Sequence, residues 1–242
     1  MSPPETPRQR WPISALRADS VTAMFVKICG ITSEEDALLA TALGADAVGL
    51  MFAPSSRQIQ PVQAYDIVRR LPPDVLTVGV FRDEAPQRVV AIMHQVGLKA
   101  AQLHGHESVD DVRYIRERVA LVIKAFAAGS SALAGVDRYP VDAILVDSAT
   151  PGSGEVFDWA LAEGAPLGRR VILAGGLTAE NVGIAIARVR PWGVDVSTGV
   201  EAAPGKKDAR KVRAFIDAAR AAAPVAYEGD QLTPYDWQED EI

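Results

Sequence analysis

Eight short apolar runs alternate with stretches of helical periodicity along most of this 242-residue chain. Most runs are nearly continuous in Val, Ile, Leu and Ala, which is typical of strands buried on both faces of a parallel sheet. Strands and helices in alternation imply right-handed crossovers between parallel strands. Eight such units predict an α/β fold, a closed (β/α)8 TIM barrel, and an open doubly wound sheet is the structural alternative. The predicted strands are 25–29, 47–52, 76–81, 99–104, 121–126, 143–147, 171–176 and 193–198.

The intervals between the runs carry the predicted helices. The stretch 86–96 has apolar residues at helical spacing from Val89 to Val96, and Pro86 suits the first turn of a helix. The fifth and sixth patterns are the shortest and weakest of the set. The predicted helices are 33–43, 62–70, 86–96, 108–118, 129–135, 157–163, 179–188 and 207–223.

The two ends of the chain differ from its middle. Residues 1–24 are rich in Pro, Arg and Ser without a period, and residues 225–242 are acidic. The chain length suits one α/β barrel without further domains. We therefore expect one barrel domain, 25–224, with a flexible N-terminal extension and a flexible acidic C-terminal tail.

Composition excludes several classes of function. The formal net charge of -6 and the pI near 5.2 argue against a nucleic-acid-binding protein, which usually has a basic face. Cys29 is the only cysteine and there are three histidines, so we expect no internal disulfide and no metal site. No apolar run approaches the ~18 residues of a membrane span, and the N-terminal segment lacks the pattern of a secretory signal. We expect a cytoplasmic protein without nucleic-acid or membrane partners.

In such a barrel, the chemistry belongs at the carboxyl ends of the strands and in the loops that follow them. This rule selects a short set of candidates, although polar strand ends occur in every barrel. The set is Lys27, Cys29, Arg57, Arg82, Gln102, His104, Lys124, Asp147, Gly175, Gly176, Asp195, Ser197 and Thr198.

The last two strand ends indicate a phosphate site. Gly175 and Gly176 follow the seventh predicted strand, and Ser197 and Thr198 end the eighth. Glycines let a backbone approach an anion closely, and the loops after strands seven and eight are where barrels usually hold a substrate phosphate. Tight turns, with Ser197 as a helix N-cap, are the plainer interpretation.

Cys29 stands two residues after Lys27, and residues two apart share a face of a strand. A nearby ammonium would lower the thiol pKa from about 8.5 and raise the thiolate fraction near neutral pH. A lone cysteine at a strand end is more often a small buried hydrophobe, and spacing alone favours that interpretation.

Asp147 and Arg57 complete the chemical candidates. Asp147 follows four apolar strand residues, so it is either a cap for the next turn or a partly buried acid whose pKa burial would raise. An acid and a base on different strands of one barrel mouth form a plausible proton-transfer pair. Arg57 can clamp a carboxylate with two hydrogen bonds, or it is a solvated loop arginine.

Nine segments in this order resemble the phosphoribosylanthranilate isomerase family of tryptophan biosynthesis. The resemblance implies a (β/α)8 barrel that catalyses an Amadori rearrangement of a phosphorylated small molecule without cofactor or metal. The segments are VKICGIT (26–32), GADAVGLMFAPSSRQI (44–59), VGVF (78–81), QLHG (102–105), LVDS (145–148), GSGEVFDW (152–159), AGGLTAENV (174–182), VDVSTGVE (194–201) and PGKKD (204–208).

The resemblance also implies roles for single residues. Cys29 corresponds to the general base, Asp147 to the general acid, and Arg57 to the contact with the anthranilate moiety. Gln102 and Asp195 are the further substrate-binding candidates. The phosphate would be held by Gly175, Gly176, Ser197 and Thr198.

The chain departs from the family pattern at two places. Ala174 replaces a serine that is common before the glycine pair, and the loop after Asp147 reads Pro151-Gly152-Ser153-Gly154 where a longer glycine-rich lead-in is frequent. Both departures concern loop closure and fine phosphate contacts rather than the proposed acid and base.

Other functions remain open on the sequence. One alternative is another sugar-phosphate barrel, such as an epimerase or the related histidine-pathway isomerase, which has a carboxylate where this chain has Cys29. A second alternative is a regulatory or scaffold barrel that keeps only phosphate binding, against which intact Cys29 and Asp147 argue. We expect a monomer or a homodimer.

Overall fold

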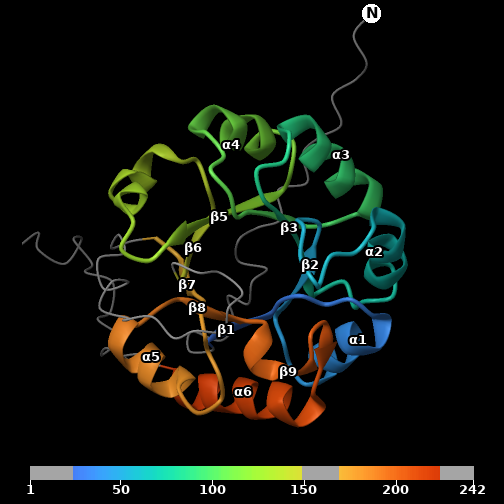
Figure 1. Ribbon diagram of the computed structural model, residues 1–242, viewed down its shortest axis with the longest axis vertical. Coiled ribbons are helices and arrows are strands. Elements are labelled where there is room, and N and C mark those ends of the chain that lie inside the picture. The colour runs from blue at the N-terminus through green and yellow to red at the C-terminus, as the bar shows by residue number, and fades with distance from the viewer. Residues whose placement is uncertain (1–23, 149–168, 224–242) are drawn as a thin grey trace, which may run out of the picture.

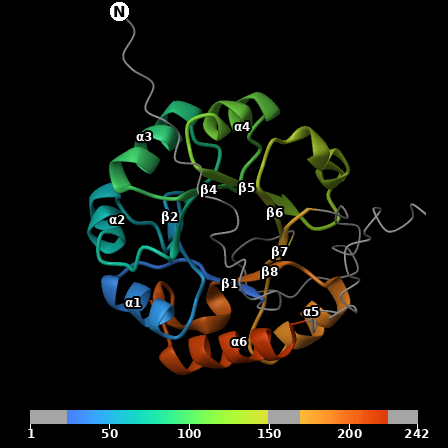
Figure 2. The ribbon, with the colours of Figure 1, turned by 180° about the vertical axis from the view of Figure 1, so that it is seen from behind.

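Eight parallel strands close into a barrel in the computed structural model, which describes residues 24–148 and 169–223. The strands pair in chain order, and β1 pairs with both β2 and β8. Figure 1 shows the helices as a ring around these strands, and Figure 2 shows the same ring from behind. The predicted (β/α)8 barrel is therefore confirmed. The strands are β1 (Phe25–Ile28), β2 (Ala47–Met51), β3 (Leu76–Phe81), β4 (Ala100–Leu103), β5 (Leu121–Ala127), β6 (Ala143–Asp147), β7 (Val171–Leu173) and β8 (Gly193–Val196).

Capping side chains and a first-turn proline mark the beginnings of several helices that follow the strands. The Ser33 hydroxyl accepts a hydrogen bond from the Asp36 backbone N–H at 3.1 Å, and Ser108 with Asp111 forms a capping box. Pro86 occupies a first turn, as the sequence predicts. The helices are α1 (Glu34–Ala42), α2 (Pro61–Val68), α3 (Pro86–Val96), α4 (Val109–Arg116), α5 (Val182–Val189) and α6 (Ala209–Ala221), with 3-10 helices η2 (Ser131–Arg138) and η4 (Thr198–Val200).

Alternating strand side chains build two hydrophobic cores, one inside the barrel and one between strands and helices. At the amino end of the barrel, Phe25 stacks on Trp192 with ring centroids 4.5 Å apart, which closes that end with apolar surface. The interior core contains Phe25, Ala47, Leu76, Val78, Ala100, Ile123, Ala125, Ala143, Leu145, Ile172 and Ala174.

The seventh and eighth predicted strands are among those that are shorter in the structure than expected. Strand β7 ends at Leu173, because Gly175 and Gly176 have φ angles of 88° and 61°, which extended backbone does not allow. Strand β8 ends at Val196, and η4 begins two residues later. The two loops therefore begin earlier than predicted.

The helical predictions differ most from the structure in two places. The segment predicted at 129–135 is the 3-10 helix η2, and the helix predicted from residue 179 begins at Val182. The helix predicted at 157–163 and the loop 151–154 lie outside the described residues, as do 1–23 and 224–242. Met24, which we placed in the N-terminal extension, is buried in the outer core.

A small hairpin after the barrel was not predicted. Strands β9 (Glu201–Ala203) and β10 (Lys206–Lys207) pair in antiparallel fashion, and Gly205 turns the chain with a φ of 77°. This hairpin carries Glu201 and Lys207, which face the barrel mouth through the contacts described below.

Candidate active site

The strand alternation directs three of the candidate residues into the barrel. Phe25 and Leu145 line the interior core, so Lys27, Cys29 and Asp147 point the same way on their strands. Lys27 is fully buried, and Cys29 and Asp147 are 5% and 8% exposed. The structure therefore places the expected base and the expected acid at the same carboxyl end, in a largely dry environment.

Lys27 links Cys29 to Asp195. The Lys27 Nζ lies 2.9 Å from the Asp195 Oδ1 and close enough to the Cys29 thiol to lower its pKa. Gly49 on β2 makes room for this group, because a Cβ there would lie 2.8 Å from the Cys29 Sγ and 3.0 Å from the Lys27 Nζ. The sulfur, the ammonium and the carboxylate thus form one buried cluster.

The charges of this cluster act on the thiol in opposite directions. Burial raises the pKa of Cys29, Lys27 lowers it, and Asp195 raises it, with a net pKa above the ordinary value. The expected lowering by Lys27 is present, but burial outweighs it, so the predicted net direction is wrong. Burial opposes the charge on Lys27, yet Asp195 and Cys29 together raise the pKa of its ammonium well above the usual range.

Asp147 meets His104 across the barrel mouth. The His104 Nε2 lies 3.3 Å from the Asp147 Oδ2, and the Ser148 backbone N–H donates to the Asp147 Oδ1 at 2.7 Å. The Gln102 Nε2 lies 3.1 Å from the His104 Nδ1, so the Gln102 amide orients the ring. The Gln102 Oε1 is buried and has no hydrogen-bond partner among residues 24–148 and 169–223.

Arg57 is held by a carboxylate that the sequence analysis assigned no role. Its Nε and Nη2 donate to the two Glu201 carboxylate oxygens, each at 2.7 Å. The Lys207 Nζ lies 3.0 Å from the Glu201 Oε1 and donates to the Ser197 carbonyl at 3.2 Å. Arg57 is therefore a fixed residue of the mouth rather than a solvated loop arginine.

Burial and charge compete within this second cluster. Burial acts to raise the pKa of Glu201, but Arg57 and Lys207 together lower it by more than burial raises it. The net pKa of Glu201 is therefore below the usual range. Burial lowers the pKa of Lys207, against the opposing effect of Glu201. Two cationic side chains, Arg57 and Lys207, share the single carboxylate of Glu201. An additional anion near Arg57 would therefore enter a site with an excess of positive charge.

The two glycine-containing loops pack against each other. A Cβ at Gly199 would lie 2.0 Å from the Leu177 carbonyl oxygen, so only glycine fits between the loops. The Asn181 side chain donates to the Gly176 carbonyl at 2.9 Å, which holds the first loop in its left-handed turn. Gly175, Gly176, Ser197 and Thr198 are thereby brought into neighbouring loops after β7 and β8.

Two strand-end candidates lie away from this group. Lys124 stands between Ile123 and Ala125, which line the barrel interior, so its side chain points to the outer face of β5. Arg82 is exposed in the turn after β3. Within the described ranges, no group of three or more His, Cys, Asp or Glu is arranged to hold a metal ion.

Sequence reasoning missed several residues of the site. Glu201 and Lys207 lie inside the segments VDVSTGVE and PGKKD. Neither segment has a pattern that predicts the hairpin through which the two residues meet. Gly49 interrupts an otherwise apolar strand, which is a usable signal that another group approaches the backbone closely.

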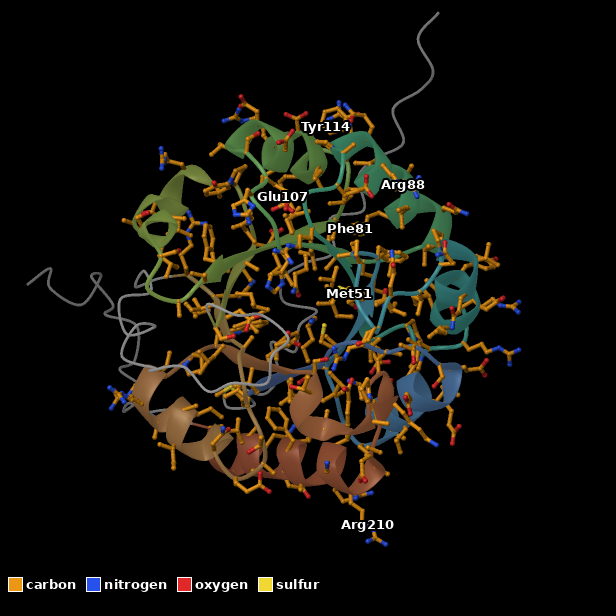
Figure 3. All side chains as sticks on the ribbon, viewed as in Figure 1. Met51, Phe81, Arg88, Glu107, Tyr114 and Arg210 are labelled. Carbon is orange, nitrogen blue, oxygen red and sulfur yellow. The ribbon has the colours of Figure 1, made fainter. Side chains whose placement is uncertain are left out.

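Figure 3 shows Met51, two residues further along β2, near the centre of the ring of helices, and Arg210 on its outer side.

The model of the N-(5'-phosphoribosyl)anthranilate isomerase family matches residues 26–218, which contain the barrel strands apart from the first residue of β1, and both clusters. The chain belongs to this family. It is therefore an isomerase of the phosphoribosylanthranilate isomerase type, as the resemblance indicated.

Relatives in this family are similar over nearly their whole length. The N-(5'-phosphoribosyl)anthranilate isomerase of Desulforudis audaxviator is 52% identical over 204 residues, which are 81% of this chain and 98% of that protein. The phosphoribosyl anthranilate isomerase of Thermus thermophilus has a crystal structure with a TM-score of 0.76 and 46% identity, covering 82% of this chain and 99% of that one.

A further solved isomerase of the family carries a ligand. That crystal structure is a complex with reduced 1-(o-carboxyphenylamino)-1-deoxyribulose 5-phosphate, at 43% identity and a TM-score of 0.72. The match covers 82% of this chain and 99% of the solved chain.

Within the described part of this chain, no helix has the length and apolar character that crossing a membrane requires.

Proposed function

We propose that this protein converts N-(5-phosphoribosyl)anthranilate into 1-(2-carboxyphenylamino)-1-deoxyribulose 5-phosphate, with Cys29 as the general base and Asp147 as the general acid. The observation that carries the proposal is the inward placement of both groups at the carboxyl end of a barrel of this family. The reduced carboxyphenylamino-deoxyribulose phosphate bound by a relative at 43% identity supports this choice of substrate class. We assign the activity to the barrel, residues 25–224.

The first step opens the sugar ring. The protonated carboxyl of Asp147 donates its proton to the ribose ring oxygen, the bond from that oxygen to C1 breaks, and the nitrogen lone pair forms a Schiff base with C1. His104, 3.3 Å from the Asp147 Oδ2, holds the carboxyl in one orientation.

The second step moves the double bond. The Cys29 thiolate removes the proton from C2, and the resulting enolamine tautomerises to the ketone when the C2 hydroxyl loses its proton and C1 gains one. The Cys29 thiol then releases its proton and Asp147 regains one, which resets the pair. Lys27 stabilises the thiolate that burial disfavours. Positioned acids and bases each contribute about 100- to 10,000-fold.

Binding energy comes from groups around the reacting carbons. Arg57 would contact the anthranilate carboxylate, and its bidentate pair with Glu201 holds the guanidinium ready. Gln102 has a buried acceptor oxygen without a partner in the described residues, which suits a substrate hydroxyl. Asp195, which pairs with Lys27, would be a further substrate contact.

The phosphate would sit between the loops after β7 and β8. Gly175 and Gly176 adopt left-handed backbone there, and Ser197 and Thr198 come from the adjoining loop. Turns of this kind present N–H groups to an anion. Remote phosphate binding also orients the ring at the acid and base.

The assembly we propose is a monomer or a homodimer. A solved relative from Thermotoga maritima, 42% identical with a TM-score of 0.70, is described as a monomeric variant of a dimeric isomerase. Light scattering during size-exclusion chromatography distinguishes the two states.

One assay tests the proposed function. N-(5-phosphoribosyl)anthranilate is formed in place from anthranilate, and the fluorescence change that accompanies its consumption is followed after the purified protein is added. We expect rapid turnover without added metal or cofactor. Turnover of the corresponding histidine-pathway aminoimidazole substrate alone, or no turnover of either, would overturn the proposal.

A further inference from the structure

A further buried ion pair lies outside the barrel interior, behind the loop that carries His104. The Lys124 Nζ is 3.1 Å from the Glu107 Oε2, and each side chain is 3% exposed. Lys124 also donates to the carbonyl oxygens of Gly105 at 2.8 Å and Leu103 at 3.3 Å. Neither residue has a role in the mechanism described above, although both charges have been removed from water.

Glu107 joins three segments of chain. Its carboxylate accepts hydrogen bonds from the Gly105 backbone N–H at 3.0 Å and from the Asp83 backbone N–H at 3.1 Å. The turn after β3, the loop after β4 and strand β5 thus converge on one carboxylate. The packing there is tight, because a Cβ at Gly105 would lie 2.3 Å from the Asp83 Oδ1. Figure 3 shows Glu107 inside the ring of helices, next to this loop.

His104 stands at the centre of the held segment. The residues on either side of it, Leu103 and Gly105, both give their carbonyl oxygens to Lys124. Its own backbone N–H donates to the Phe81 carbonyl at 2.8 Å. The backbone of His104 is therefore held from both sides while its ring reaches the other way, to Asp147.

We propose that Glu107 and Lys124 are positioning residues for the isomerisation: their ion pair fixes the 103–107 loop so that the His104 imidazole stays against the Asp147 carboxyl. This inference rests on the proposed function, in which Asp147 is the acid. The ion pair acts only through His104 and touches no reacting atom. Stability alone does not explain the pair, because two well-packed apolar residues often stabilise a fold at least as well as a buried salt bridge.

The test compares two ways of removing the pair. Glu107→Gln keeps an acceptor for the two backbone N–H groups but leaves Lys124 without its countercharge. The double variant Glu107→Gln/Lys124→Met removes both charges at similar volume, which avoids an uncompensated buried ammonium. Asp142→Asn is the matched control, because Asp142 also joins a backbone N–H, that of Val122, to a cationic side chain, but it precedes β6 at the amino end of the barrel.

We expect kcat of the double variant to fall about 10- to 100-fold, because small misplacements of catalytic groups have costs of this size. KM should change little, because the phosphate and anthranilate contacts are untouched. The control should keep the wild-type kcat. The ring signals of His104 in nitrogen-15 NMR should shift in both Glu107 variants and stay in place in the control.

The deciding measurement repeats the substitutions in a His104→Asn background. If the pair acts through His104, adding Glu107→Gln should change kcat there by less than about twofold. A full wild-type kcat in folded Glu107→Gln, an unshifted His104 ring, or an equal loss of kcat with and without His104 would overturn the inference. An inactive wild-type protein would instead refute the proposed function, and an inactive Asp147→Asn beside an active Glu107→Gln would refute only the positioning role.

Discussion

Lys27 and Asp195 face each other inside the barrel on strand positions that the sheet register pairs, with 2.9 Å between the ammonium Nζ and the carboxylate Oδ1. The pair joins the first strand to the last, where the barrel closes. Cys29 lies on the same face of β1 as Lys27, so barrel closure and the charge environment of the thiol depend on the same two side chains.

Substitutions in this pair should move the thiol pKa in opposite directions. Lys27→Met should raise the pKa of Cys29 further, because the ammonium is the group that lowers it. Asp195→Asn should lower that pKa, because the carboxylate raises it. Thiolate absorbance followed as a function of pH gives both values. Shifts of the same sign in both variants, in proteins with native melting curves, would contradict the electrostatic account.

Gly49 should be required for the space that Cys29 occupies. A Cβ at this position meets the Cys29 Cα at 3.2 Å as well as the sulfur at 2.8 Å, so Gly49→Ala should displace the thiol and lower kcat. Overpacking of this kind costs about 1–3 kcal/mol of the free energy of unfolding. Gly183→Ala is the control, because its nearest neighbour is the Ala222 Cβ at 3.7 Å. Gly183→Ala should keep the wild-type kcat. Its free energy of unfolding should rise by up to about 1 kcal/mol, because alanine favours the helical backbone of α5 more than glycine does.

Glu201 should stabilise the fold in a defined range of pH. Its folded-state pKa is lowered by Arg57 and Lys207 against the effect of burial, so its contribution is complete above the usual carboxyl pKa of about 4.3. That contribution is lost as the pH falls through the lower folded-state value. Urea unfolding at several pH values should therefore show a shallower acid-side decline in Glu201→Gln than in the wild type. Equal declines would remove Glu201 from the acid linkage.

Gly176 should govern phosphate affinity. Gly176→Ala places a side chain on backbone with a φ of 61° in the loop after β7, so KM should rise about tenfold or more and kcat should fall less. Gly97→Ala provides the control, because Gly97 has a similar φ of 76° but ends α3, far from the mouth. Its stability should fall while KM stays at the wild-type value. Equal KM values in the two variants would argue against this phosphate loop.

The barrel was predictable because its signal is local and repeated. Each buried strand is a short apolar run of its own, and the helix over 86–96 agrees with α3 at both bounds. The segment 129–135 failed because a short pattern does not distinguish α-helix from the 3-10 helix η2. The seventh strand was extended too far because apolar continuity does not register the left-handed backbone of Gly175.

The candidate site was predictable only in part. Strand-end position and the family motifs selected Cys29 and Asp147, whose roles stay predictions, but they could not show that Glu201 holds Arg57. That contact joins residues 144 positions apart through a hairpin without a strong pattern of its own. The sign of the Cys29 pKa shift also needed the structure, since Lys27 is visible in the sequence whereas complete burial is not.

The central claim is that Cys29 removes the C2 proton, and the kcat of Cys29→Ser tests it most directly. Serine keeps the shape of the side chain but replaces the thiol with a hydroxyl that is far harder to ionise. The account predicts a loss of about 100-fold or more in kcat, with KM nearly unchanged and a native melting curve. A folded Cys29→Ser protein with nearly the full wild-type kcat would contradict the assignment of the base.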